Sequence, residues 1–268
     1  MRVVTAIATS LLCAWCAATL ASAQRMRVPR GCVAVKNAAA SHDGYASGVK
    51  HKKTGIELVL LPAGSFKSDD RQITFAKPFY VGRTEVTNGQ YKRFMEQSGY
   101  DGLPDVDPGY ELYLLHLRGR STMPTGDDFP IVFVSWHNAK AFCQWSGELE
   151  LPSDAQWSYC AQAPRTEGTE GWIMNISGGH THEVARRKPN AWGIHDLFGN
   201  VWEWCLDDHV LDAPLPSDGS ARRREGQLTK VLRGGSWSTR RSWAGRSVNQ
   251  APGNAANDAG FRVVMPLP

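Results

Sequence analysis

Cysteine is scarce in this sequence, and none follows Cys205 in the last part of the chain. Of the six cysteines, Cys13 and Cys16 lie in an apolar N-terminal stretch. The other four are Cys32, Cys143, Cys160 and Cys205. No two of these four have the CxxC spacing that is typical of structural zinc sites, so we set such a site aside. In an exported protein, four cysteines permit two disulfides in any of three pairings.

A strong excess of charge is also absent. The formal net charge is +4 for 268 residues, and it falls to +3 when Arg2 is removed with the leader described below. This weakly basic balance predicts no nucleic-acid partner. For the basic run Arg222-Arg223-Arg224 we expect a solvated loop. No internal repeat with a period of about 20–50 residues is present, so a repeat architecture is not expected.

Residues 1–23 are typical of a secretory signal peptide. Arg2 gives the positive start, an apolar run follows, and Ala21-Ser22-Ala23 fits the small-x-small cleavage rule. The alternative is a transmembrane anchor, which needs about 20 strongly apolar residues, whereas this run is short and rich in alanine. We therefore expect an exported protein, periplasmic or secreted, that begins at Gln24 and has no membrane span after removal of the leader.

Residues 24–53 lack periodicity and predict a linker or flexible N-terminal arm, followed by one domain over residues 54–268. Strands are expected at 57–61 and 130–134, and a hairpin element at 72–75 and 79–82. Helices are expected after Thr87 or Asn88, after Ser135, and after Ser153, where Gln156 completes a capping box. The stretch 99–128 predicts a long loop with a short helix at 110–117, and the chain after Pro164 turns irregular.

Blocks rich in glycine, tryptophan and charge follow one another in the second half of the chain. They are Gly-Asn-Val-Trp-Glu-Trp at 199–204, Leu-Arg-Gly-Gly-Ser-Trp at 232–237 and Gly-Phe-Arg-Val-Val at 260–264. With earlier segments at 59–66, 84–91, 130–147 and 151–157, they resemble the sulfatase-modifying-factor domain, whose best-known member is the formylglycine-generating enzyme. The resemblance covers residues 54–264. It implies an α+β fold of the C-type-lectin-like kind, with low regular secondary structure.

The resemblance also shows what this chain lacks. The aerobic formylglycine-generating enzymes hold copper with two cysteines that follow the Gly-Gly-Ser block. Counted without gaps, the corresponding places hold Thr239 and Ala244 here. Soft thiolate ligands select Cu(I), so we do not expect the copper-dependent reaction, and the sequence names no other redox metal.

The segment 196–203 matches a calcium site of the family. The implied ligands are the carboxylates of Asp196 and Glu203 with the backbone carbonyls of Leu197, Gly199 and Val201. Calcium takes six to eight oxygen ligands, which a glycine-containing loop of alternating carbonyls supplies, and its role would be structural. The alternative is a tryptophan-rich turn in which Glu203 forms an ion pair.

A rival metal motif is His-Thr-His-Glu at 180–183. In a strand, two residues at i and i+2 share a face, so His180 and His182 would converge, with His195 or Asp207 as a third ligand. A flexible loop is the alternative. No Ser-His-Asp set is present, and the adjacent carboxylates of Asp207 and Asp208 point apart, which makes them poor acid–base candidates.

The resemblance places the substrate cleft around the 234–246 segment. The candidates are Ser236, Trp237, Arg240, Arg241, Trp243 and Arg246. Tryptophan and arginine are frequent in recognition surfaces because they offer area, stacking and forked donors. The alternative is a solvated loop with two core indoles.

Two functions remain open. The first is an oxidoreductase, related to the formylglycine-generating enzyme but without its copper site, that modifies an exported protein or peptide. The second is a non-enzymatic, calcium-stabilised lectin-like module that presents the 237–257 loops to a peptide or glycan. An accessory factor of a biosynthetic or secretion locus is a third, weaker interpretation.

Overall fold

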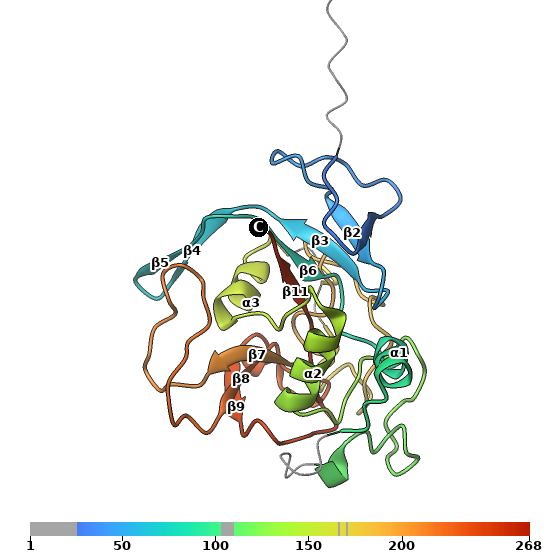
Figure 1. Ribbon diagram of the computed structural model, residues 1–268. Helices are drawn as coiled ribbons and strands as arrows, with labels where there is room; N and C mark the ends of the chain where they lie inside the picture. Colours follow the sequence, from blue (N-terminus) through green and yellow to red (C-terminus); the bar gives the residue numbers. More distant parts are fainter. Residues whose placement is uncertain (1–25, 103–109, 166, 170) are drawn as a thin grey trace, which may run out of the picture.

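The computed structural model describes residues 26–102, 110–165, 167–169 and 171–268. Its largest sheet is antiparallel, has five strands and lies at the top of Figure 1. Its strands, in spatial order, are β1 (Cys32–Ala34), β2 (Gly48–His51), β3 (Glu57–Leu61), β6 (Phe79–Gly82) and β11 (Val264–Pro266). The last strand of the chain thus pairs with an early one, which closes the domain.

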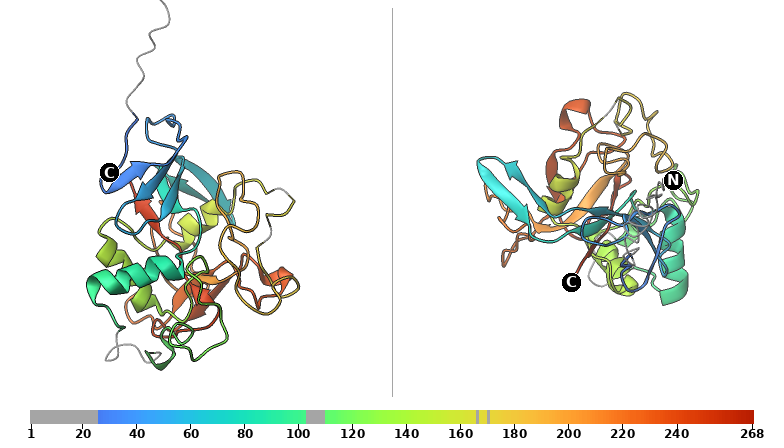
Figure 2. Two further views of the ribbon diagram at one scale, coloured as in Figure 1. Left: turned by 90° about the vertical axis from the view of Figure 1, so that its right-hand side faces the viewer. Right: turned by 90° about the horizontal axis from the view of Figure 1, so that it is seen from above.

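A second sheet carries the glycine- and tryptophan-rich blocks. In spatial order its four strands are β10 (Ala259–Gly260), β7 (Trp202–Asp208), β8 (Lys230–Arg233) and β9 (Ser247–Gln250). The β10–β7 pair is parallel and the other two pairs are antiparallel. A separate hairpin of β4 (Gly64–Ser68) and β5 (Arg71–Phe75) projects from the body (Figure 2).

Each of the three described α-helices begins at a capping box, as the sequence predicted for Ser153 and Gln156. The helices are α1 (Asn88–Ser98), α2 (Trp136–Ser146) and α3 (Asp154–Cys160). Thr87, Ser135 and Ser153 are the N-caps, and in each case the residue three positions later returns a side-chain bond to the cap. The caps satisfy backbone N–H groups that the first helical turn leaves free, which fixes where each helix starts.

The main core lies between the large sheet and the α1–α2 pair. Rings from both helices meet there, with Tyr91 5.2 Å from Phe94 and 5.9 Å from Phe142, measured between ring centroids. The Phe261 ring reaches the same cluster, 5.4 Å from Phe142. Tyr91 and Phe94 thus form the buried face of α1, and Met95 packs at its margin.

The expectation of a flexible arm at 24–53 is wrong for the described part of this segment. Strands β1 and β2 extend the large sheet, with Val49 opposite Leu58 of β3, and Val49 is fully buried. The buried imidazole of His51 bonds Thr54 at 2.9 Å and Glu148 at 3.0 Å, which anchors the strand. Strands of three and four residues are too short to show periodicity, so the sequence pattern missed them.

Two further expectations need correction. Residues 72–75 and 79–82 are strands, but they do not form a hairpin, because β5 pairs with β4 and β6 pairs with β3 and β11. Residues 130–134 are buried but form no strand, since Phe133 has a left-handed φ of +57°. Of the expected helix at 110–117, only the 3-10 turn η1 (Tyr110–Leu112) is helical.

The predicted signal peptide at 1–23 lies outside the described residues. Within the described part of the chain, every helix is too short or too polar to cross a membrane.

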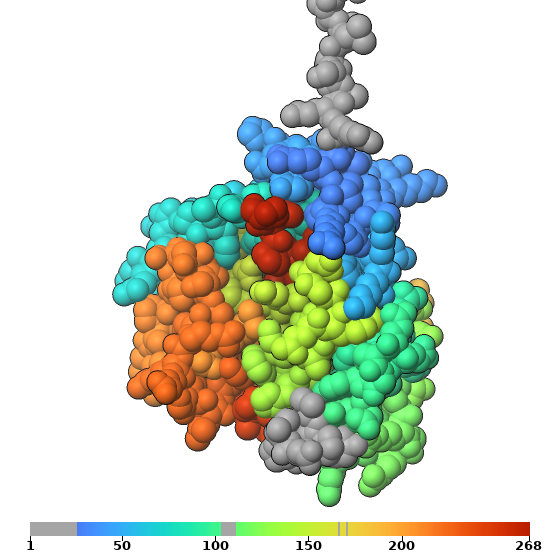
Figure 3. Space-filling view, viewed as in Figure 1, coloured from blue at the N-terminus to red at the C-terminus, as the bar shows by residue number. Residues whose placement is uncertain are grey.

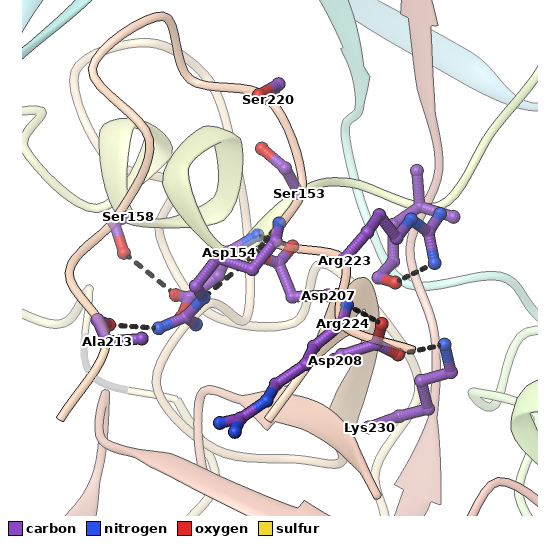
Figure 4. A network of polar contacts seen from close by, with 12 residues as sticks. Ser153, Asp154, Ser158, Asp207, Asp208, Ala213, Ser220, Arg223, Arg224 and Lys230 are labelled. Carbon is purple, nitrogen blue, oxygen red and sulfur yellow. Dashed lines mark hydrogen bonds and ion pairs between the residues drawn. The ribbon is translucent and has the colours of Figure 1, made fainter. Parts of the chain in front are cut away.

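A long loop at 209–229 is held by a network of ion pairs rather than by a ladder of backbone bonds. Arg222 contacts the carboxylates of both Asp154 and Asp207, and its side chain is 14% exposed. Asp208 turns to the other side and pairs with Lys230 (Figure 4). The expected solvated loop is therefore wrong for Arg222, whereas the divergence of Asp207 and Asp208 is confirmed.

This loop also supports the projecting hairpin. The N–H of Thr74 donates to the carbonyl of Ser217 at 2.8 Å, and Gly219 lies directly against the ring of Phe75. In the space-filling view the orange loop lies directly below the teal β4–β5 hairpin and borders the yellow-green atoms in the centre (Figure 3). The ion pairs of Arg222 thus hold two peripheral segments on the core.

We predict that Arg222→Met lowers the free energy of unfolding by about 3 kcal/mol, because it leaves two buried carboxylates without their shared cation. Arg223→Met is the matched control, since Arg223 is exposed and donates only to the carbonyl of Leu206. We expect that change to cost less than about 0.5 kcal/mol. Urea denaturation measures both. Equal losses for the two variants would contradict the assignment of Arg222 as the anchor.

Candidate functional site

A buried ion pair lies where the sequence blocks meet. Arg262 donates to both carboxylate oxygens of Glu203, through Nε at 2.9 Å and Nη2 at 2.7 Å. The Trp157 indole adds a third bond to Glu203 at 2.7 Å. Arg262 also donates to the carbonyls of Gly82 at 2.8 Å and His195 at 2.9 Å. One guanidinium thus joins the end of β6, the 195 loop, β7 and the C-terminal segment.

Two more buried carboxylates belong to the same charge cluster. Both oxygens of Glu85 and one oxygen of Asp196 are buried without a hydrogen-bond partner, while the other Asp196 oxygen accepts from the N–H of Ala185 at 2.7 Å. Burial, and then the charge of Asp196, raise the pKa of Glu85 well above its usual value. Burial also raises the pKa of Asp196 to about 6. Three carboxylates therefore share one guanidinium.

The cluster contains Asp196 and Glu203, the two carboxylate ligands that the resemblance implies for a calcium site. Three unpartnered carboxylate oxygens fit a hard divalent cation, which takes oxygen ligands and would favour the ionised form of both side chains. Glu203 is in the ion pair that the sequence left open as the alternative, because its oxygens already accept from Arg262 and Trp157. Glu85 is the residue that sequence reasoning missed, although it stands in the quoted 84–91 block.

The loop that would supply carbonyl ligands has an unusual backbone. Asp196 and Asn200 have left-handed φ values of +58° and +61°, and Gly199 has φ +140°. A side chain at Gly199 would lie 2.4 Å from the carbonyl oxygen of Trp172, so only glycine fits there. Because of this backbone, the 196–203 segment changes direction sharply. It lies between the buried carboxylates and the pocket described next.

The pair His180 and His182 is used for packing. The His182 ring stacks on Trp172 with a centroid distance of 3.7 Å, and its Nε2 bonds the carbonyl of Ser177 at 2.7 Å. The suggested third ligands are engaged elsewhere, since His195 bonds the carbonyl of Arg187 and Asp207 pairs with Arg222. Among the described residues, no three side chains of the metal-ligating types converge on one point.

A pocket of about 510 Å³ lies beside the 196–203 turn. One wall comes from the irregular segment after α3, one from the turn before β7, and one from the 3-10 turn η2 (Arg241–Trp243). The lining residues are Arg165, Glu167, Thr169, Ile173, Phe198, Arg241 and Ala244. The guanidinium of Arg165 lies 4.4 Å from the centre of the Phe198 ring, a cation–π contact at the pocket wall.

Only one of the six predicted cleft residues, Arg241, lines this pocket. Arg240, Trp243 and Arg246 are exposed on the same segment, and Arg246 packs over the Trp243 ring at 5.3 Å. Trp237 is half-buried, with its indole N–H bonded to the carbonyl of Asn257 at 3.3 Å.

Ser236 lies inside the protein rather than in the pocket wall. It is fully buried, its hydroxyl donates to Asp258 at 2.9 Å, and its N–H donates to the Thr239 hydroxyl at 2.8 Å. Gly234 and Gly235 before it have φ values of +100° and +91°, as expected of a tight glycine turn. These bonds make Ser236 a brace for the loop that carries the cleft residues.

Known proteins match both the sequence and this geometry. A family model described as the sulfatase-modifying factor enzyme 1-like domain matches residues 46–267. The chain belongs to this family. The formylglycine-generating enzyme of Streptomyces coelicolor is 28% identical in an alignment that covers 69% of this chain and 77% of that protein. The start of the match at residue 46 places β2 inside the family domain.

Solved structures show the same fold. PvdO from Pseudomonas aeruginosa has a TM-score of 0.67 and 28% identity, covering 87% of this chain and all of that one. Treponema denticola variable protein 1 has a TM-score of 0.60 and 22% identity, covering 78% and 95%. The predicted α+β, C-type-lectin-like fold with low regular secondary structure is confirmed.

The structure shows which residues stand at the two places where the resemblance puts the cysteine pair, and where the cysteines of this chain lie. Thr239, at one of the two places of the cysteine pair, is buried and bonded to Ser236, whereas Ala244, at the other, lines the pocket. All four described cysteines are buried and free, so none of the permitted disulfides is formed. Burial raises the pKa of Cys32 to about 11 and that of Cys143 and of Cys160 to about 12. The described lining of the pocket thus contains Ala244 but no thiolate.

We predict that protein beginning at Gln24 resists alkylation by iodoacetamide at pH 7.5 while it is folded. The thiolate is the reactive form, and burial both blocks access and keeps these thiols protonated. In denaturing urea all four cysteines should react. Intact-mass spectrometry counts the added groups. Rapid modification of the folded protein would show an exposed thiolate and contradict the structure.

Proposed function

We propose that the protein is exported and binds a protein or peptide partner in the pocket next to Ala244, which it modifies as an oxidoreductase without thiolate-bound copper. The observation that supports this proposal is that Ala244, one of the two places at which the resemblance puts the missing cysteine pair, lines the 510 Å³ pocket. The formylglycine-generating enzymes among its relatives act in the oxidoreductase class. In such a step two electrons and two protons leave the partner, and a co-substrate such as dioxygen accepts them.

The pocket has features of a site that binds a peptide-like ligand. Phe198 and Ile173 offer apolar surface, while Arg165 and Arg241 offer forked donors for carboxylate or carbonyl oxygens. The segment 234–239, braced by Ser236, fixes the direction in which η2 enters the pocket. These features support binding at this place more directly than they support any particular reaction.

The second candidate is the non-enzymatic module that binds a peptide or glycan through the 237–257 loops. The described pocket lining favours it in one respect, because that lining contains neither cysteine nor histidine. The nucleophiles and bases of covalent catalysis are mostly residues of these types. The two candidates make different predictions about the mass of the partner.

We propose calcium as a structural cofactor of the same domain. Asp196 and Glu85 would supply unpartnered carboxylate oxygens, with carbonyls of Leu197, Gly199 and Val201, while Glu203 stays paired with Arg262. The cation would neutralise carboxylates that are otherwise buried at a large cost in free energy. It would stabilise the turn that separates the buried cluster from the pocket.

Chelation with EGTA should lower the melting temperature of the wild-type protein. A ligand that binds only the native state adds about 3 kcal/mol at a hundredfold excess over its Kd. Glu85→Gln and Asp196→Asn should abolish the response to calcium, whereas the exposed Asp70→Asn should keep it. If no cation binds, the wild-type melting curve is unchanged in EGTA, and Glu85→Gln raises stability because it removes an uncompensated buried charge.

The function is tested by a pocket-filling variant. Cells without the gene are complemented with the wild type, with Ala244→Trp, or with Ala63→Trp, a control at an exposed turn after β3. We expect mass spectrometry of the exported fraction to show a partner that has lost hydrogen or gained oxygen with the wild type and the control only. A partner that co-purifies with unchanged mass supports the binding module, and no pocket-dependent partner of either kind overturns the proposal.

A further inference from the structure

We infer that the rim of the pocket docks an acidic peptide segment that also carries an apolar side chain. This inference rests on the proposed function, because it names the chemical class of the partner at the same pocket. It uses three observations: the exposed arginines, the absence of carboxylate partners for Arg165, Arg240 and Arg246 within the described residues, and the exposed apolar residues on the neighbouring segments.

The charge around the pocket is mostly positive. Arg165 and Arg241 line the pocket, Arg240 and Arg246 flank it, and Glu167 is the only acidic residue in its described lining. By contrast, Arg222 is paired with Asp154 and Asp207, and Arg262 with Glu203. No ion pair with a carboxylate is found within the described residues for Arg165, Arg240 or Arg246, whose side chains are exposed.

Exposed apolar residues occur beside these arginines. Met174 is 49% exposed, Ile176 is 40% exposed and Trp243 is 50% exposed. They belong to one surface, because the N–H of Met174 donates to the carbonyl of Thr239 at 3.1 Å, which joins the two segments. Large apolar side chains that gather on a surface mark a contact region more often than a free one.

The chemistry of this rim selects its partner. A guanidinium binds a carboxylate through two parallel hydrogen bonds, and arginines above an aromatic ring keep that geometry. Arg165 over Phe198 and Arg246 over Trp243 both have this arrangement. A segment with acidic residues on both sides of an apolar one would place carboxylates on the guanidiniums and its apolar side chain on Met174 and Trp243. A basic segment would be repelled.

The test measures binding of fluorescein-labelled decapeptides by fluorescence anisotropy. The first peptide has four glutamates and two leucines, the second has glutamine in place of each glutamate, and the third has lysine there. We expect the acidic peptide to bind at least about tenfold more tightly than the glutamine peptide, because each charged hydrogen bond contributes substantially to affinity. Added salt should weaken the acidic peptide most, since it screens exposed charges.

Two pairs of variants locate the binding. The double variant Arg165→Gln with Arg246→Gln should weaken the acidic peptide at least about tenfold. Arg71→Gln with Arg120→Gln removes the same charge from exposed arginines elsewhere and should leave binding unchanged. Met174→Gln should weaken binding, whereas Leu228→Gln, at a residue that is 80% exposed on another loop, should not. Melting curves confirm that all the variants are folded.

The outcomes separate this inference from the proposed function. Equal or tighter binding of the glutamine or lysine peptide, still lost in Ala244→Trp, overturns the acidic partner and leaves the pocket proposal standing. Tighter binding of a single-stranded oligonucleotide at the same arginines also overturns it, in favour of a phosphate polymer. A response of the control arginines equal to that of Arg165 and Arg246 shows unspecific attraction. Failure of all three peptides to bind overturns the acidic partner, whereas the proposed function is decided separately by the partner mass found with Ala244→Trp.

Discussion

The buried pair of Arg262 and Glu203 is the interaction on which the rest of this structure depends. Removing one partner of such a pair costs about 3–5 kcal/mol, because the other charge stays buried without compensation. The pair also uses every direction of the guanidinium, since Arg262 reaches Gly82 and His195 as well as Glu203. It therefore aligns the C-terminal Gly-Phe-Arg block with the Trp-Glu-Trp block. The Trp-Glu-Trp block begins strand β7, which follows the turn beside the pocket. The two partners are 59 residues apart in the sequence, so the pair is a long-range contact that joins two of the family blocks.

Charged side chains replace regular secondary structure as the means of ordering the loops. Arg222 holds the 209–229 loop through Asp154 and Asp207, and His51 fixes the edge of β2 through Glu148. The Glu85 and Asp196 cluster has carboxylates in excess of its single guanidinium, which is why a cation is the proposed completion of that part of the core. Low content of helix and strand is thus compatible with an ordered domain, because side-chain bonds to backbone carbonyls and N–H groups satisfy the polar groups that ladders would otherwise pair.

Structural features that depend on a few neighbouring residues were predictable from the sequence, whereas pairings between distant segments were not. A capping box is complete within four residues, so the start of α3 at Ser153 follows from the sequence alone. The pairing of β5 with β4 and the incorporation of β1 and β2 into the large sheet depend on partners that short strands do not specify. The apolar run before Ser135 gave a wrong strand, because Phe133 is buried in a left-handed conformation that composition does not indicate.

The candidate site was likewise predicted only in part from the sequence. The family blocks located Arg241 and the position of Ala244, yet they placed Ser236 in the cleft, whereas the fold buries it as a brace. Most of the pocket comes from the irregular segment with Arg165 and Ile173, which has no periodicity from which a structure could be predicted.

Burial separates the arginines into two groups with different roles. Arg262 and Arg222 are held by carboxylates of the protein and stabilise it, while the exposed Arg165, Arg240 and Arg246 have no carboxylate partner among the described residues. Any ligand that the pocket binds will therefore be selected by the second group, and changes in that group can alter the ligand without loss of the fold.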